Sequence, residues 1–103
     1  MTPILVYITT SSQEEAKTLS KLLLDKKLVA CTNIIPNMNS FYFWEGKIDS
    51  SQECVLLLKT FKEKYPELER VILENHSYEI PCLLTLPLEV NLDYLHWMKS
   101  QVK

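Results

Sequence analysis

Apolar residues recur at helical spacing in three segments of the chain. The three sets are Ala16, Leu19, Leu22 and Leu23; Leu68, Val71 and Ile72; and Leu92, Leu95, Met98 and Val102. Their period of about 3.6 residues predicts three amphipathic helices, the first running to about Lys27. Two serine–glutamate pairs before this helix match the capping box that starts many helices. The pairs are Ser11 with Glu14 and Ser12 with Glu15.

Similar signals precede the other two helices. Thr60 and Glu63 form a candidate cap pair for the second helix, and Pro66 suits its first turn. Asn91 is a candidate cap for the third helix, because a short amide side chain can accept from the free backbone N–H groups there.

Between the helices the pattern changes to the β-branched, aromatic and aliphatic residues that favour strands. The predicted strands cover residues 3–10, 28–35 continued by 40–44, 47–59, and 82–88. The first is almost entirely apolar, which is typical of a central strand. Pro36 interrupts the second, and a proline there predicts an edge position or a bulge.

The order of these elements is strand, helix, strand, strand, helix, strand, helix. It predicts one α+β domain over residues 1–103, a ferredoxin-like split βαβ sandwich (βαββαβ) with an added C-terminal helix. The length of 103 residues is that of one small domain.

Gly46, the only glycine, follows Glu45 between two long predicted strands. A two-residue turn needs positive φ, which glycine supplies, so the strands form a long hairpin. Strand alternation places Phe41, Phe43 and Ile48 on one of its faces, with Tyr42 and Trp44 on the other. A monomer would expose both sets, so the sequence predicts a homo-oligomer in which a second subunit covers the hairpin. The alternative is a hairpin that curls back onto its own helices.

Composition and charge narrow the functional classes. Eleven basic and thirteen acidic residues leave a net charge of -2, which argues against nucleic acid or an anionic membrane as the main partner. No apolar run reaches the ~20 residues of a membrane helix, and the N-terminus does not resemble a signal peptide. Three widely spaced cysteines suit a reducing compartment, so we expect a cytoplasmic protein.

Three segments together resemble the CutA family of divalent-cation tolerance proteins. They read LVACTNIIPNMNSFYFWEGKI, KTFKEKYPELERVILENHSYEIPCLLTLPLE and DYLHWM, and with them the resemblance covers nearly the whole chain. It implies a ferredoxin-like homotrimer, similar to the PII signalling proteins, whose long strands extend sheets across subunits. It further implies a link to tolerance of copper and other divalent metals, and no established catalysis.

The chain departs from the family pattern at several positions. Asn37 stands where the family often has glycine, although asparagine tolerates the left-handed geometry of a bulge. Thr9 and Thr10 lie where proposed copper-binding members carry a cysteine, and Asn75 replaces a histidine of some members. The copper site that the resemblance implies is therefore incomplete.

His76, Glu79 and Cys82 form the candidate metal site. Imidazole, carboxylate and thiolate are ligands for Cu(II) or another divalent cation, and the three residues lie within one irregular segment. Alternatively, His76 ends a helix or bonds to backbone, and Cys82 is a small apolar strand residue. His96 and the other two cysteines are better explained by surface and core positions.

Five further residues are candidates for an intersubunit cleft or interface: Tyr42, Trp44, Glu53, Lys59 and Tyr78. Their alternative role is hydrogen bonding between subunits. The sequence has no glycine-rich phosphate loop and no motif of a nucleophilic or zinc enzyme, so we expect no catalysis. The leading hypothesis is a cytoplasmic trimer that binds divalent metal weakly in that cleft. The alternative is a PII-like trimer that binds a small ligand or protein, with an indirect metal effect.

Overall fold

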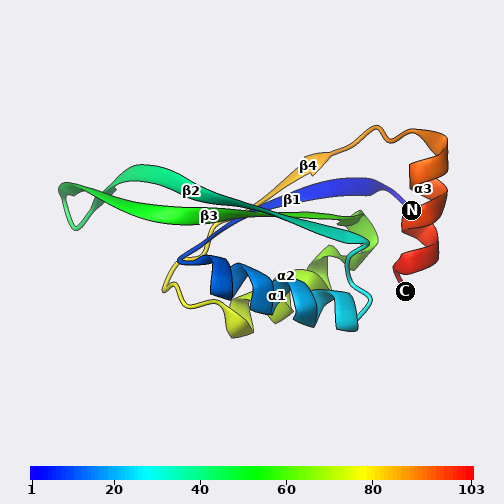
Figure 1. Ribbon diagram of the computed structural model, residues 1–103, viewed down its shortest axis with the longest axis horizontal. Helices are drawn as coiled ribbons and strands as arrows, with labels where there is room; N and C mark the ends of the chain where they lie inside the picture. Colours follow the sequence, from blue (N-terminus) through cyan, green and yellow to red (C-terminus); the bar gives the residue numbers. More distant parts are fainter.

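The computed structural model describes residues 1–103 as one four-stranded sheet with the order β2-β3-β1-β4. Its elements are β1 (Pro3–Thr10), α1 (Gln13–Asp25), β2 (Cys31–Trp44), β3 (Lys47–Phe61), the 3-10 turn η1 (Lys62–Lys64), α2 (Tyr65–Asn75), β4 (Leu83–Pro87) and α3 (Leu92–Gln101). Helices α1 and α2 lie side by side under one face of the sheet, and α3 stands at the end that holds both termini (Figure 1). The predicted ferredoxin-like order is confirmed.

Every neighbouring pair of strands is antiparallel. The two strands that each helix connects run parallel, but a third strand lies between them: β3 separates β1 from β2, and β1 separates β3 from β4. This is the split βαβ arrangement that the element order predicts.

Alternating residues of the two central strands form the core. Val6 and Ile8 of β1, with Leu56 and Leu58 of β3, are fully buried. They pack in one cluster with apolar residues of α1 and α2, which include Leu19, Leu23, Leu68 and Ile72. For α1 and α2 the helical spacing read from the sequence is therefore the spacing of the buried helix faces, whereas in α3 Met98 is buried and Leu92 is 65% exposed.

Several predicted boundaries differ from the structure: β3 runs to Phe61 rather than residue 59, and β4 covers Leu83–Pro87 rather than 82–88. The second strand begins at Cys31 rather than residue 28, because other hydrogen bonds occupy the backbone of Leu28. Its N–H donates to the Leu23 carbonyl at 3.1 Å, and its carbonyl accepts from the Thr60 hydroxyl at 2.6 Å. Thr60 is therefore not a helix cap. Glu63 accepts from the backbone N–H of Thr2, and α2 begins at Tyr65.

The hairpin of β2 and β3 extends well beyond the helices (Figure 1), and the molecule measures 46 × 24 × 22 Å. Its register has the predicted pairs, including Trp44 with Lys47 and Phe43 with Ile48. Glu45 and Gly46 both have positive φ, at 51° and 79°, as a two-residue hairpin turn requires. The bulge after Pro36 is built on Asn37, with φ of 63°.

The two faces of the hairpin differ in exposure. Phe41, Phe43 and Ile48 are 76%, 75% and 72% exposed, as predicted for a free apolar face. Tyr42 and Trp44 are only 40% and 43% exposed, because the other face turns toward residues 77–82 of the same chain. The expectation that a lone subunit exposes aromatics on both faces is confirmed, although the second face is the less exposed of the two.

Candidate functional site

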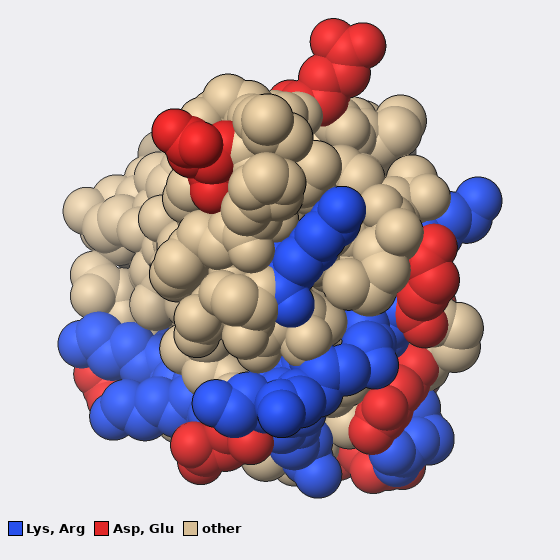
Figure 2. All heavy atoms as spheres, turned by 90° about the vertical axis from the view of Figure 1, so that its right-hand side faces the viewer, with Lys and Arg blue, Asp and Glu red and all other residues tan.

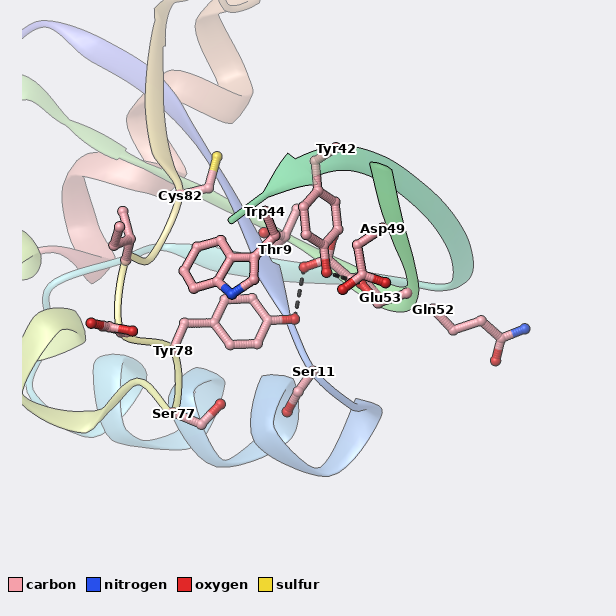
Figure 3. A pocket seen from close by; sticks show the side chains of 13 residues that line it. Thr9, Ser11, Tyr42, Trp44, Asp49, Gln52, Glu53, Ser77, Tyr78 and Cys82 are labelled. Carbon is pink, nitrogen blue, oxygen red and sulfur yellow. Dashed lines mark hydrogen bonds between the residues drawn. The ribbon is translucent and has the colours of Figure 1, made fainter. Parts of the chain in front are cut away.

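A cleft of about 580 Å³ lies between the hairpin and the segment that follows α2. The hairpin contributes Tyr42, Trp44, Asp49, Ser51, Gln52 and Glu53; the segment contributes Ser77, Tyr78, Glu79, Ile80 and Cys82; and the β1–α1 junction contributes Thr9 and Ser11. Figure 3 shows the rings of Tyr42, Trp44 and Tyr78 projecting into one space beside the carboxylates of Asp49 and Glu53. The cleft brings together residues that are far apart in the sequence.

Glu15 of α1 fixes the segment after α2. One of its carboxylate oxygens accepts from the N–H and hydroxyl of Ser11, both at 2.9 Å, and the other accepts from the Ser77 N–H at 2.7 Å. Partial burial alone would raise the pKa of Glu15, but these hydrogen bonds outweigh burial and lower the pKa. The predicted cap pair is present in part, since Ser12 accepts from the Glu15 N–H while the Glu15 carboxylate bonds to Ser11.

His76 is a second anchor of the same segment. Its Nε2 lies 2.8 Å from the carbonyl oxygen of Thr9, so Nε2 carries the proton and donates it. Its Nδ1 accepts from the N–H of Tyr78 at 3.0 Å. The His76 side chain is 0% exposed, and both of its ring nitrogens are engaged with backbone groups.

The structure does not gather His76, Glu79 and Cys82 into a metal site. Glu79 and Cys82 line the cleft, whereas His76 lies beneath it with no free lone pair. The chain has no group of three or more His, Cys, Asp or Glu side chains that could hold a metal ion. A tightly bound copper ion therefore does not fit these three residues as they are arranged, and the observed bonds of His76 match the alternative backbone role.

Glu53 and Tyr78 form the central polar contact of the cleft. The Tyr78 hydroxyl donates to a carboxylate oxygen of Glu53 at 2.7 Å (Figure 3). Burial, reinforced by this carboxylate, raises the pKa of Tyr78, and burial together with the negative charge of Glu53 raises the pKa of the Cys82 thiol. At neutral pH the cleft therefore presents a neutral phenol and a protonated thiol, and Cys82 is a poor thiolate ligand.

Of the five cleft or interface candidates, the structure brings together Tyr42, Trp44, Glu53 and Tyr78. Lys59 lies elsewhere: it is six residues from Glu53 along β3, about 20 Å in an extended strand, and its ammonium contacts the hydroxyl of Tyr94 at 3.4 Å. Its predicted place in the cleft is not observed.

Sequence reasoning missed Asp49 and Ser51 as cleft residues. Asp49 is paired with Tyr42 across the hairpin, and residues that are paired across strands share a face. Ser51 and Glu53 follow it at intervals of two on the same face. The predicted register contained this signal, whereas the contribution of Thr9 and Ser11 depends on how the loop folds.

The charge of the cleft is one-sided. Its lining contains Asp49, Glu53 and Glu79 and no Lys, Arg or His. At the end of the molecule remote from the hairpin tip, Lys and Arg side chains form a band that is interspersed with acidic groups (Figure 2). The distribution of charge therefore favours a cation over an anion in the cleft.

Comparison with known proteins identifies the family. The model of the family described as CutA1 divalent ion tolerance protein matches residues 4–101. The chain belongs to the CutA1 family. The divalent-cation tolerance protein CutA of Archaeoglobus fulgidus is 42% identical over 99 residues, which are 95% of this chain and 96% of that protein. The rice protein CutA 1 is 37% identical over 101 residues, and the chain spans 97% of its own length but 57% of the rice protein.

Solved structures of CutA1 proteins have the same fold. Rice CutA1 superposes with a TM-score of 0.97 at 36% identity, covering 100% of this chain and 95% of that chain. The Archaeoglobus fulgidus protein gives 0.94 at 41% identity, covering 98% and 99%. The latter is described as periplasmic and the rice protein as chloroplastic, so cytoplasmic location remains a prediction for this chain. None of its helices combines the length and apolar character needed to cross a membrane.

Proposed function

We propose that the chain forms a cytoplasmic homotrimer that contributes to the tolerance of divalent cations, including copper. It would do so by binding these cations weakly, with the cleft as the functional site. The main support is the acidic, aromatic cleft that an apolar hairpin and an anchored loop build together. The names of the relatives support the link to divalent cations. The cleft has ligand-binding chemistry and no arranged nucleophile, which favours binding over catalysis.

The exposed apolar faces support the oligomer. Phe41, Phe43 and Ile48 form an uncovered face on the hairpin. Leu84 and Leu86 of β4 are also exposed, on the side of the sheet opposite the buried helices. Burying ~300 Å² of such surface contributes several kcal/mol at about 25 cal/mol per Å². A second subunit that wraps around the hairpin would also border the cleft, and the family resemblance, which implies a homotrimer, supports three subunits.

The carboxylates support weak metal binding. Asp49, Glu53 and Glu79 line one cleft but do not form a group that could hold a metal ion directly, so the binding proposed here is weak and reaches a hard divalent cation through its water. His76 would not take part, because both of its nitrogens bond to backbone. The cation is therefore proposed to lie near these carboxylates, of which only Glu79 belongs to the set His76, Glu79 and Cys82 that the sequence suggested.

A second candidate is a PII-like trimer that binds a small ligand or a protein, so that metal tolerance is an indirect effect. The observation in its favour is that aromatic rings and polar groups form most of the cleft, while the chain lacks a compact set of metal ligands. Such a lining is typical of sites for organic molecules.

Two measurements test the proposal. Light scattering should give three times the chain mass of 12.1 kDa. Calorimetric titration of Cu(II) should give weak binding that Glu79→Gln reduces and His76→Ala leaves unchanged. A monomer would refute the trimer. No heat with Cu(II), Zn(II) or Mg(II) would refute direct metal binding and favour the second candidate.

A further inference from the structure

Glu53 is a buried carboxylate that no basic side chain of the chain pairs with. It is 9% exposed, and its one side-chain hydrogen bond comes from the neutral Tyr78 hydroxyl. None of the ion pairs of the chain includes it. An ionised carboxylate has about four acceptor positions, and burial of a charge is costly unless a counter-charge lies nearby. The cleft is therefore arranged for a positively charged group that comes from elsewhere.

Aromatic rings surround this charge. Tyr42, Trp44 and Tyr78 project into the space beside Asp49 and Glu53 (Figure 3). The faces of aromatic rings attract cations, tryptophan most strongly, and the attraction grows when the cation is poorly hydrated. A bare metal ion gains little from rings compared with oxygen ligands. An alkylated nitrogen is attracted by the rings and by the carboxylates, because its methyl groups pack on the rings while its charge faces Asp49 and Glu53.

We propose that this cleft binds a small organic cation whose charge lies on an alkyl-substituted nitrogen. The inference rests on the proposed use of the cleft as the functional site, and it names the class of ligand. It favours the second candidate function, in which the bound species is an organic molecule and the metal effect is indirect.

The rings are held in place before any ligand arrives. The Tyr78 N–H donates to His76 and its hydroxyl to Glu53, so both ends of this residue are fixed. The segment that carries it is further tied to α1 by the Ser77–Glu15 bond at 2.7 Å. The backbone of Trp44 is paired with Lys47 at the end of the hairpin, and the Tyr42 hydroxyl donates to the Ser51 hydroxyl at 3.3 Å. Such preorganisation reduces the ordering cost of binding.

The experiment uses the full chain and two probes of the same shape, one charged and one uncharged. Choline is the cation, and 3,3-dimethylbutan-1-ol replaces its nitrogen by carbon. The Trp97→Phe background leaves Trp44 as the only tryptophan, so its fluorescence reports the cleft. Sodium chloride at matched concentration controls for ionic strength. We expect saturable binding of choline and about ten-fold weaker binding of the alcohol.

Variants locate the site. Glu53→Gln retains an acceptor for Tyr78 and should weaken choline binding about ten-fold or more. If Glu53→Gln folds poorly, Asp49→Asn removes a different negative charge from the cleft, and we expect it to weaken choline binding by a smaller factor. Phe43→Leu, on the opposite face of the hairpin, should leave binding unchanged.

Three results would overturn the inference. They are equal affinity for the two probes, choline binding that survives both charge removals, and no saturable choline signal in the folded protein. The last would indicate that a charged side chain of a second subunit fills the cleft. Failure of the proposed trimer or of metal binding appears separately, in the scattering mass and the Cu(II) titration.

Discussion

The hydroxyl of Tyr78 lies 2.7 Å from a carboxylate oxygen of Glu53, and this contact joins the segment after α2 to the central strand β3. It crosses 25 residues of sequence and closes one side of the cleft. Because Glu53 is almost fully buried, the contact satisfies a charge that water reaches poorly.

Tyr78→Phe removes this hydrogen bond and keeps the ring. We expect a loss of about 1 to 3 kcal/mol in the free energy of unfolding, since the bond serves a charged acceptor. Urea denaturation at fixed protein concentration measures it. Tyr42→Phe is the matched control: its hydroxyl makes only an exposed 3.3 Å bond to Ser51, and its removal should cost less than about 0.5 kcal/mol. Equal losses in the two variants would contradict this role.

Glu15→Gln should destabilise the protein in a pH-dependent way. The folded-state pKa of Glu15 lies below its ordinary value of 4.5, so folding favours the ionised form. The stabilisation is complete above the pKa of the unfolded chain and disappears as the pH falls through the lower folded pKa. We expect Gln to cost about 1 to 2 kcal/mol at neutral pH and progressively less in acid.

Urea midpoints of both proteins across this pH range measure the difference. Glu14→Gln is the control, because Glu14 makes only an exposed contact with Lys17 at 3.8 Å. A cost of Glu15→Gln that stays constant into strong acid would show that shape, and not charge, stabilises the segment.

The sequence predicted those parts of the fold that depend on local periodicity. The hairpin register followed from Glu45 and Gly46, because a two-residue turn fixes every pair on either side. Pro66 was correctly predicted in the first turn of α2, but the cap pair was wrong, because the side chains of Thr60 and Glu63 bond to tertiary partners instead. Such competition between local and distant partners is invisible in a single sequence.

The site was predictable only in part. Alternation along the hairpin placed Tyr42 and Trp44 on one face, but did not identify the segment that faces them. The metal hypothesis rested on the nearness of His76, Glu79 and Cys82 in sequence. The fold separates them, because His76 finds two backbone partners under the loop. A bend in the chain can bring neighbouring side chains together or point them apart, and the spacing of the residues in the sequence does not predict which of the two occurs.

Phe43→Asp should weaken the proposed oligomer. Phe43 is 75% exposed in one subunit, and covering a phenylalanine contributes about 1.5 to 3 kcal/mol, or about a ten- to hundred-fold change in dissociation constant. Light scattering over a dilution series should show dissociation at higher concentration than for the unaltered chain. Glu45→Lys changes the charge of the tip without touching this face, and should leave the mass unchanged. Unchanged mass in both variants would show that no subunit covers the hairpin there.

Cys82 should react slowly with iodoacetamide, and Glu53→Gln should accelerate the reaction. Burial raises the pKa of the Cys82 thiol first, and the charge of Glu53 raises it further, so the reactive thiolate is scarce near neutral pH. Removing that charge lowers the pKa and shifts the pH dependence of alkylation downward, while burial keeps part of the effect. Mass spectrometry of the labelled peptides measures the rates, and Cys31, outside the cleft, provides an internal reference. A Glu53→Gln variant that accelerates both cysteines equally would indicate loosening of the fold. Acceleration of Cys82 alone indicates that Glu53 acts on the cleft through its charge.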